Sequence, residues 1–229
     1  MPPQPLVSII TPSYNQAQFI EKTIRSVLEQ DYPNIEYLVV DGGSDDGSVE
    51  IIKQYQSKLA WWVSEKDSGQ AEAINKGFTR ARGEIVAWIN SDDYLMSGAV
   101  TEAVKSLLEH PNAAFVFGDV RVVEKEGTIL NQLAYGDWGL SDLMAFRIIG
   151  QPAVFMRRSA LEKTGFLDLS YHLLLDHHLW IRLATIGGMF YVPSLWAGAH
   201  YHEGCKNLSM AAGFGSEAHR IVDWMRKSP

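Results

Sequence analysis

The chain has 229 residues, of which 46% are hydrophobic and 21% are charged, a balance typical of a globular protein with one sizeable core. This composition excludes a largely disordered chain. The formal net charge of −7 argues against a nucleic-acid partner, because nucleic-acid-binding proteins usually present a basic face to the phosphates. The single cysteine, Cys205, cannot form an internal disulfide, so nothing in the sequence requires an oxidising compartment.

The amino-terminal end does not read as a secretion signal, because residues 1–5 contain no basic segment followed by a long apolar stretch. The longest apolar runs, such as Ile35–Val40 and Ile85–Ile89, are far shorter than the roughly 20 residues that a membrane-spanning helix needs. We therefore expect a cytoplasmic enzyme or binding domain.

Short apolar runs alternate with helical patterns over the first half of the chain. Buried strands are predicted at Leu6–Thr11, Ile35–Val40, Ala60–Ser64 and Ile85–Asn90. Apolar residues at helical spacing predict a helix before Pro33, a second helical crossover begins near Asp46, and a third helix covers Gln70–Arg80. Gly83 is expected to take a left-handed conformation just past that helix. The alternation is typical of parallel strands joined by helical crossovers, as in a Rossmann-like fold.

Beyond Asp93 the pattern becomes mixed. A helix is predicted over Ala99–Leu108, a strand over Ala114–Phe117, and a hairpin of Val120–Val123 with Thr128–Leu133 around Glu126–Gly127. Further helices are expected at Ser159–Thr164, Asp176–Ile186 and Ser216–Lys227, the first two ended by glycines. No linker separates these parts, so the sequence predicts one α/β domain over residues 1–229, with a nucleotide-type half over about 1–95 and a mixed half over about 96–229. The sheet is expected to be mostly parallel, with helices on both faces.

Polar residues follow all four predicted strands of the first half, where an open parallel sheet binds its ligands. They lie in the segments Thr11–Asn15, Asp41–Asp46, Glu65–Gly69 and Ser91–Asp93. The loop after the second strand also suits an ordinary turn or helix cap. Its glycine spacing matches neither a dinucleotide fingerprint nor a P-loop.

Asp92 and Asp93 are adjacent carboxylates at the end of a buried strand. They could start a helix, but in that place they repel each other unless a cation or a proton neutralises them. Mg²⁺ or Mn²⁺, held by one or two carboxylates and substrate phosphates, is the natural partner.

Asp176 opens a helix whose apolar stripe includes Leu179 and Leu183, so its side chain should face the interior or a cleft. An N-cap role is the alternative. His177 and His178 are expected to be surface or packing residues.

Five segments occur in a characteristic order, and they point to a family. They are Val7–Asn15, Val39–Ser48, Ala73–Gly77, Gly83–Asp93 and Asp176–Leu183. With them the chain resembles family-2 glycosyltransferases of the GT-A fold, over roughly Leu6–Asn207. The resemblance implies a half that binds a nucleotide and a half that binds an acceptor.

The resemblance also implies roles for residues of the nucleoside pocket. Asp41 would accept a hydrogen bond from the base, usually uracil, in a pocket lined by Pro12, Tyr14 and Asn15. Asp67 lies where the family also approaches the nucleoside.

For the reacting end of the donor, the resemblance implies that Asp93 binds the Mn²⁺ or Mg²⁺ that bridges the diphosphate. Asp92 would support that ion or contact the ribose. Asp176 matches the presumed general base, and His202 matches a histidine that completes the metal or diphosphate site. His200 is the alternative for that last role.

The chain departs from the family pattern at three positions. Gly42 follows Asp41 where many relatives have a second aspartate, Asn90 replaces the first acid of a strict D-x-D motif, and Leu175 precedes Asp176 where relatives often have glutamate. The Q-x-x-R-W motif and membrane helices of processive relatives are missing from the sequence.

The implied reaction is metal-dependent transfer of a sugar, with inversion, from a nucleoside diphosphate, most often UDP, to a hydroxyl of a glycan or lipid-linked acceptor. Polysaccharide or glycoconjugate biosynthesis is the expected setting. Two other functions stay open: a sugar-1-phosphate nucleotidyltransferase, although no basic glycine-rich loop follows the first strand, and a sugar-nucleotide or glycan-binding module without catalysis.

Some assignments in the second half and at the diphosphate stay open as well. Lys76, Arg80 and Lys206 could contact the diphosphate or be solvated charges. The residues Gln151, Pro152, Phe155, Trp180 and Trp196 could shape an acceptor pocket or fill the core. The last helix could contact the inner face of a membrane, or pack against the domain or a second copy of the chain.

Overall fold

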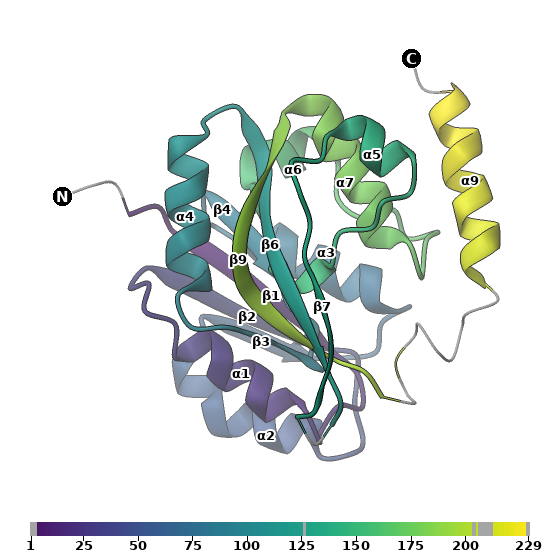
Figure 1. Cartoon of the computed structure of the whole chain (residues 1–229). Helices are drawn as coiled ribbons and strands as arrows, with labels where there is room; N and C mark the ends of the chain where they lie inside the picture. Colours follow the sequence, from purple (N-terminus) through teal and green to yellow (C-terminus); the bar gives the residue numbers. More distant parts are fainter. Residues whose placement is uncertain (1–3, 126, 203–204, 206–212, 228–229) are drawn as a thin grey trace.

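A single β-sheet runs through both halves of the chain in the computed structural model, which describes residues 4–125, 127–202, 205 and 213–227 (Figure 1). The strand order is β3-β2-β1-β4-β8-β6-β9-β5, and β7 pairs with β6 alone. The strands are β1 (Val7–Ser13), β2 (Ile35–Asp41), β3 (Trp61–Ser64), β4 (Ile85–Trp88), β5 (Asp93–Leu95), β6 (Ala113–Val123), β7 (Ile129–Leu133), β8 (Val154–Arg157) and β9 (Gly188–His200).

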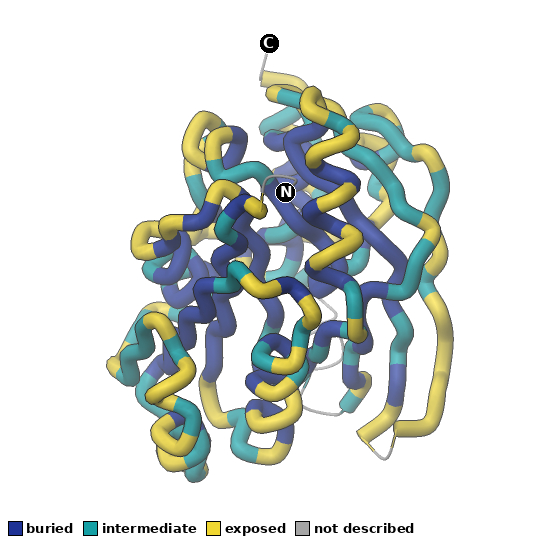
Figure 2. The backbone as a smooth tube through the Cα atoms, turned by 90° about the vertical axis from the view of Figure 1, so that its left-hand side faces the viewer, coloured by how far each residue is buried: buried dark blue, intermediate teal, exposed yellow. Residues whose placement is uncertain are grey.

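The first four strands are parallel, as the alternating pattern predicts. Their side chains alternate between two apolar layers: Ile9 and Val39 pack on one face of the sheet, and Ile10 and Leu38 on the other. This burial on both faces explains why these strands read as continuous apolar runs. In Figure 2 the tube of the central strands is dark blue, while exposed residues lie on the outer segments.

Helices cover both faces of the sheet. The helices α1 (Ile20–Leu28), α2 (Ser48–Tyr55) and α4 (Ala99–Glu109) pack on one face. On the other face lie α3 (Gln70–Arg80), α5 (Leu140–Met144), α6 (Arg158–Thr164), α7 (Leu175–Ile186) and α9 (Phe214–Lys227). Figure 1 shows the two groups on either side of the sheet.

The second half is mixed, as expected, but its strands are longer than the sequence indicates. Two separate strands were expected within Ala113–Val123, and the structure has one strand, β6, with register shifts near Phe117 and Asp119. Those irregularities interrupt the period of two, which makes one bulged strand resemble two short ones. The predicted hairpin with β7 is present, and Gly127 in its turn has φ 90°.

Gly83 does not adopt the predicted left-handed conformation. α3 ends with Ala81 in an extended conformation, and Gly83 is needed for a different reason. A Cβ atom at this position would lie 2.6 Å from the backbone nitrogen of Ser8, so only glycine allows the chain to pass this close to β1.

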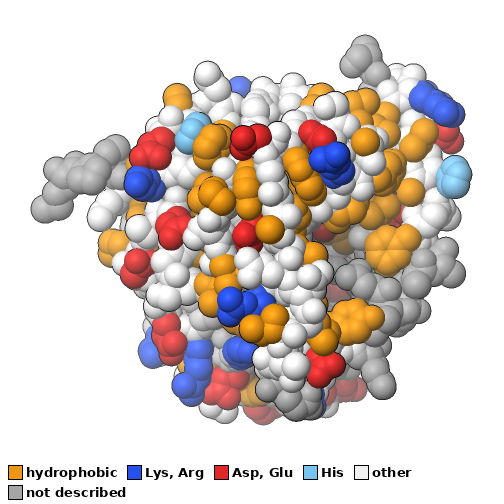
Figure 3. Space-filling view, in the orientation of Figure 1, with side chains coloured by type: hydrophobic (Ala, Val, Ile, Leu, Met, Phe, Trp, Pro, Cys, Tyr) orange, Lys and Arg blue, Asp and Glu red, His pale blue; other side chains and the backbone are white. Residues whose placement is uncertain are grey.

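The carboxyl-terminal helix α9 packs along the same side of the molecule as α7 (Figure 1). Its residue Ile221 is fully buried, and Trp224 and Met225 pack against the core, so its apolar face is turned to the domain. Charged and histidine side chains lie on its outer side, at the right of Figure 3. None of the helices in the described ranges has both the length and the apolar character needed to cross a bilayer.

Candidate active site

A cleft of about 1430 Å³ opens at the carboxyl ends of β1 to β4. Loops after these strands line it together with the start of α7, the end of β9 and the first turns of α9. Of the residues that the sequence assigned to a site, the following line this cleft: Pro12, Tyr14, Asp67, Asp92, Asp93 and Asp176. The side chains of Asn15, Asp41 and His202 lie outside its lining.

Four polar atoms of the cleft have no hydrogen-bond partner within the described part of the chain, although they are buried. They are Ser13 Oγ, Gln16 Oε1, Trp88 Nε1 and Gln151 Oε1. The amide nitrogen of Gln151 donates to the carbonyl of Trp88 at 2.8 Å, so its remaining oxygen has a fixed direction. Because a buried polar atom without a partner costs about 1–3 kcal/mol, these four atoms leave unsatisfied polar groups directly behind the wall of the cleft.

Asp41 ends β2 and is completely buried. Its carboxylate accepts hydrogen bonds from the backbone nitrogens of Gly43 and Ser44 and from the hydroxyls of Ser44 and Ser64, at 2.5–3.0 Å. Three of these donors bind Oδ2 and one binds Oδ1, so most of the acceptor capacity of the carboxylate is used within these loops. In this structure Asp41 therefore holds the loop that presents Gly42 and Gly43 to the cleft, and it does not itself face the cleft.

Asp67 lies over Gly42, from the loop that follows β3. A Cβ atom on Gly42 would come within 2.9 Å of Asp67 Oδ2, so the glycine that replaces a second aspartate makes room for this carboxylate. Burial raises the pKa of Asp67 above its usual value. Its Oδ1 accepts from the backbone of Gly69 at 2.9 Å, and Oδ2 has no hydrogen bond within the described ranges. Of Asp41 and Asp67, which follow β2 and β3, Asp67 is the acid that lines the cleft.

The turn between β4 and β5 carries Asp92 and Asp93, and α1 fixes it. The hydroxyl of Thr23 lies 2.9 Å from the carbonyl oxygen of Ser91 and 2.6 Å from that of Asp93. Asn90, at the first position of the motif, donates to Asp93 Oδ2 at 3.3 Å. The backbone of this turn is thus fixed from α1, and the Asp93 carboxylate is held by Asn90 of the same turn.

Burial and the neighbouring Asp92 raise the pKa of Asp93 well above its usual value. A divalent cation would relieve this repulsion, and the oxygen donors suit Mg²⁺ or Mn²⁺. Within the described ranges, no three His, Cys, Asp or Glu side chains are grouped closely enough to hold a metal ion by themselves. The residues therefore fit an ion whose remaining ligands come from a diphosphate and water.

The structure distinguishes the two candidate histidines. His202 Nε2 lies 3.1 Å from Asp92 Oδ2. His200 Nδ1 bonds to the carbonyl oxygen of Asp92 and must donate there, so its Nε2 accepts a hydrogen bond from Lys22 Nζ at 3.1 Å. Both ring nitrogens of His200 are occupied, which leaves His202 as the histidine whose ring contacts the Asp92 carboxylate.

Asp176 is the second residue of α7, and it lines the cleft as expected. The alternative prediction, that Asp176 is the N-cap of this helix, is wrong. The N-cap is Leu174, whose side chain has no polar atom to bind the helix. Asp176 Oδ1 accepts from the backbone of His177 at 2.7 Å. His177 and His178 are buried, in agreement with a packing role.

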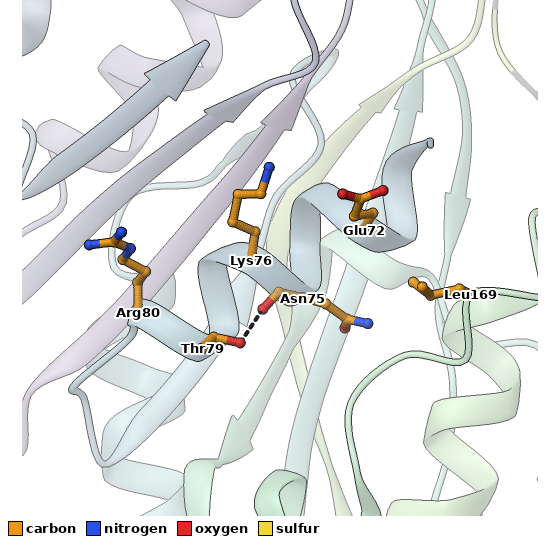
Figure 4. Close-up of a pocket in the computed structure, with 6 residues that line it drawn as sticks. All are labelled: Glu72, Asn75, Lys76, Thr79, Arg80 and Leu169. Atoms are coloured by element: carbon orange, nitrogen blue, oxygen red, sulfur yellow. Dashed lines mark hydrogen bonds between the residues drawn. The ribbon is translucent and has the colours of Figure 1, made fainter. Parts of the chain in front are cut away.

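Basic residues at the cleft differ from those that the sequence suggested. Lys76 pairs with Glu65 at 2.7 Å, and Arg80 lies over the ring of Trp61. Both lie on α3 around a separate shallow pocket, outside the lining of the main cleft (Figure 4). Lys206 falls outside the described residues.

In the described part of the chain, Lys66 is the one lysine or arginine that lines the main cleft. Its position after β3, next to Asp67 in the sequence, is the signal that could have identified Lys66 as a residue of the cleft.

The candidate acceptor residues fall into two groups. Gln151 and Pro152 line the cleft, whereas Phe155, Trp180 and Trp196 are completely buried in the core.

Glu217 of α9 is not among the predicted site residues. It is a buried acid whose carboxylate contacts the segment directly before α7.

The model of the family described as "Glycosyl transferase family 2" matches residues 8–164 of this chain. The chain belongs to glycosyl transferase family 2. It is therefore a glycosyltransferase, and the two other functions that the sequence left open lose their support. The matched segment contains Asp41, Asp67, Asp92 and Asp93, and it ends before Asp176 and His202.

Individual relatives agree with this assignment. The glycosyltransferase is 33% identical over 190 residues to TuaG of Bacillus subtilis, a protein named for teichuronic acid biosynthesis, and the match covers 80% of this chain and 74% of TuaG. Other curated relatives are longer: the chain spans 36% of a glycosyltransferase of Rickettsia conorii at 26% identity.

Solved structures confirm the fold. The complex of Staphylococcus aureus TarS with UDP-GlcNAc superposes with a TM-score of 0.76 at 18% identity, over 94% of this chain and 64% of that one. The mannosyltransferase PcManGT of Pyrobaculum calidifontis, solved with GDP-Man and Mn²⁺, gives a TM-score of 0.65 at 24% identity, over 85% of this chain and 57% of that one. The α/β fold with a curled mixed sheet is thus that of GT-A glycosyltransferases.

Proposed function

We propose that this glycosyltransferase moves a sugar from a nucleoside diphosphate, UDP in the first place, to an acceptor hydroxyl, with a divalent cation and with inversion at the anomeric carbon. The observation that carries the proposal is that one cleft holds both the adjacent acids Asp92 and Asp93, of which Asp93 is buried and has its pKa raised beside Asp92, and a further acid, Asp176, from a different element. The first half, about residues 1–95, binds the nucleotide, and the second half, about 96–229, binds the acceptor.

The nucleoside is held by the loops after β1 and β3. Pro12 and Tyr14 line the cleft, and Tyr14 has 64% of its surface exposed, so a base can pack against its ring. Asn15 accepts a hydrogen bond from the backbone of Asp45 through its side chain and fixes the loop after β1 to the loop after β2. Asp67 supplies the acceptor for the base or ribose, and Asp41 acts through the loop that it holds.

The diphosphate end is held at the turn of Asp92 and Asp93. A bound Mg²⁺ or Mn²⁺ would neutralise the charge that develops on the departing diphosphate, which is where transition-state stabilisation is largest. Asp93 is the principal ligand, Asp92 supports it, and His202 completes the site or contacts the diphosphate. The proposal of Mn²⁺ draws support from PcManGT, whose structure contains that ion.

Asp176 is the general base. The acceptor oxygen forms a bond to the anomeric carbon, the bond from that carbon to the diphosphate breaks with its electron pair on the phosphate oxygen, and the hydroxyl proton passes to the Asp176 carboxylate. The start of α7 favours the anionic form of this acid, because the helix dipole is positive there.

The acceptor is proposed to be a glycan or a lipid-linked saccharide at the inner face of the membrane, in keeping with the polysaccharide for which TuaG is named. A contribution of a second copy of the chain, or of a membrane surface, to binding of the acceptor stays a prediction.

The test compares Asp93→Asn and Asp176→Asn by calorimetry with UDP and Mn²⁺ and by release of UDP from a panel of sugar nucleotides. We expect Asp93→Asn to lose the metal-dependent part of UDP affinity, and Asp176→Asn to keep that affinity but lose about 10²–10⁴-fold in turnover. Glu109→Gln, an exposed change on α4, is the control. Unchanged metal-dependent affinity in Asp93→Asn, or a wild-type enzyme that hydrolyses no sugar nucleotide with either metal, would overturn the proposal.

A further inference from the structure

Glu217 of α9 is buried, and its carboxylate accepts three backbone hydrogen bonds from the segment that leads into α7. Oε1 accepts from the nitrogen of His172 at 2.8 Å, and Oε2 accepts from the nitrogens of Leu173 and Leu174 at 3.0 and 2.8 Å. Burial raises the pKa of Glu217, but these N–H groups outweigh it and hold the pKa below its usual value. The three N–H donors therefore stabilise the ionised form of the Glu217 carboxylate.

Leu174, the residue at the cap position of α7, has no polar side chain. The three N–H groups that Glu217 binds belong to this residue and to the two residues before it, so they precede the first turn of the helix. Glu217, more than 40 residues further along the chain, therefore fixes the segment that leads into α7. The backbone two residues before Asp176 thus depends on a side chain of α9.

Two other contacts hold the same region. Arg220 donates to the carbonyl and hydroxyl oxygens of Ser170 at 3.0 and 2.6 Å, and its guanidinium lies 4.5 Å from the ring centre of Tyr171. On the other side of Asp176, the ring of Trp224 packs edge-on against His178 with centres 4.8 Å apart. α9 therefore contacts the chain both before and after the proposed base.

The first turn of α9 also reaches the cleft, through Phe214 and Ala218. The helix that holds the α7 start thus forms part of the wall around Asp176. A displacement of the base by about 1 Å can cost about 10²-fold in rate, so the support of Asp176 bears on turnover as well as on folding.

We propose that Glu217 is a positioning residue for the base: by binding, from α9, the backbone that leads into α7, it sets where the Asp176 carboxylate lies in the cleft. The inference rests on the proposed function of Asp176. It adds α9, which lies beyond the part of the chain that the family model matches, to the machinery of transfer.

The first measurement is the turnover of Glu217→Gln. The amide keeps the size of the side chain but places an N–H donor against backbone N–H groups. We expect kcat for release of UDP from the preferred UDP-sugar to fall about 10–100-fold. The dissociation constant and stoichiometry of UDP with Mn²⁺, measured by calorimetry, should stay within about twofold, because the nucleotide binds at other loops. Asp223→Asn removes an exposed carboxylate from the same helix and should retain the wild-type kcat.

The decisive measurement is the double variant Glu217→Gln with Asp176→Asn. If Glu217 acts through Asp176, the double variant turns over no more slowly than Asp176→Asn alone; a purely structural role predicts that the two losses multiply. Multiplying losses, or a wild-type kcat in Glu217→Gln, would overturn the inference while leaving Asp176 as the base. A wild-type kcat in Asp176→Asn would instead reject the proposed base, and the inference with it.

A second variant covers the case in which Glu217→Gln fails to fold. Arg220 is exposed, so Arg220→Met loosens the same segment without removing a buried group. We expect a smaller fall in kcat, about 3–10-fold on the same reasoning about displacement, with UDP affinity unchanged. If Glu217→Gln loses UDP binding and Arg220→Met retains the wild-type kcat, the positioning role is rejected.

Discussion

At the scale of single residues, the proposed nucleoside pocket depends on contacts between two neighbouring loops. In the loop after β2, Asp41 is occupied by four hydrogen bonds, and Gly42 offers no side chain. Asp67, from the loop after β3, fills the space above Gly42. A carboxylate from a different loop therefore stands beside the position at which many relatives carry their second aspartate.

This arrangement predicts the effect of Gly42→Ala. The new methyl group would lie 2.9 Å from Asp67 Oδ2 and would push the carboxylate out of place. We expect UDP affinity to fall about 10-fold, the size of one hydrogen bond to a charged group, with little loss of thermal stability. Calorimetry with UDP and Mn²⁺ measures it. Gly139→Ala, where a methyl group meets open space, serves as the control. An affinity equal to that of the wild type would show that Asp67 does not contact the nucleotide.

At the scale of secondary-structure elements, α7 carries two buried histidines directly after the proposed base. His177 packs against Phe146, and His178 lies between Tyr171 and Trp224. Burial lowers the pKa of each to about 4, and nearby Arg182 contributes for His178. These rings are neutral wherever the enzyme is folded near neutral pH, and they join α7 to the elements on either side of it.

The depressed pKa values predict acid sensitivity. The unfolded chain binds protons at these histidines near pH 6.5, whereas the folded chain binds them only near pH 4. Their contribution to stability is therefore complete above pH 6.5 and is lost as the pH falls toward 4, at up to about 1.4 kcal/mol per pH unit for each ring. His178→Phe should make the free energy of unfolding less steep between pH 6.5 and 4.5, as measured by urea unfolding. His219→Gln, at an exposed site, should keep the wild-type slope; an unchanged slope in His178→Phe would contradict the assignment.

At the scale of the whole molecule, the sheet brings the carboxyl-terminal part of the chain back to the nucleotide-binding edge. β9 pairs with β6 and β5, so residues near position 200 stand beside Asp93. His202 reaches Asp92 across 110 positions of sequence, and α9 closes onto α7. The proposed metal site and the proposed base are both completed by segments that come late in the chain.

Because no three ligating side chains are grouped within the described ranges, metal and nucleotide should bind together. We expect Mn²⁺ alone to change the unfolding temperature by less than about 1 °C. UDP and Mn²⁺ together, at 100 times the dissociation constant, should add about 2.7 kcal/mol of stability, or about 5 °C for a chain of this size. Thermal unfolding with each ligand alone and with both tests this. A full shift with Mn²⁺ alone would indicate a preformed metal site instead.

The sequence by itself determined the parallel first half, because each of its strands is a short, mainly apolar run with a polar segment at its end. The acids Asp67, Asp92, Asp93 and Asp176 were predicted on that basis or by resemblance, and all of them line one cleft. Such features depend on local periodicity, which adjacent residues carry.

Only the tertiary structure decided which groups face that cleft. In the fold, the Asp41 carboxylate binds its own loop and both ring nitrogens of His200 have other partners. The side chain of Glu217 contacts the segment that precedes α7. The tertiary structure also joined two predicted strands into β6. The contacts of His200 and Glu217, and the contact of Asp41 with Ser64, join residues 23 to 178 positions apart, whereas the other donors to Asp41 are the nearby Gly43 and Ser44. No local pattern specifies which distant donor will occupy a given carboxylate or ring nitrogen.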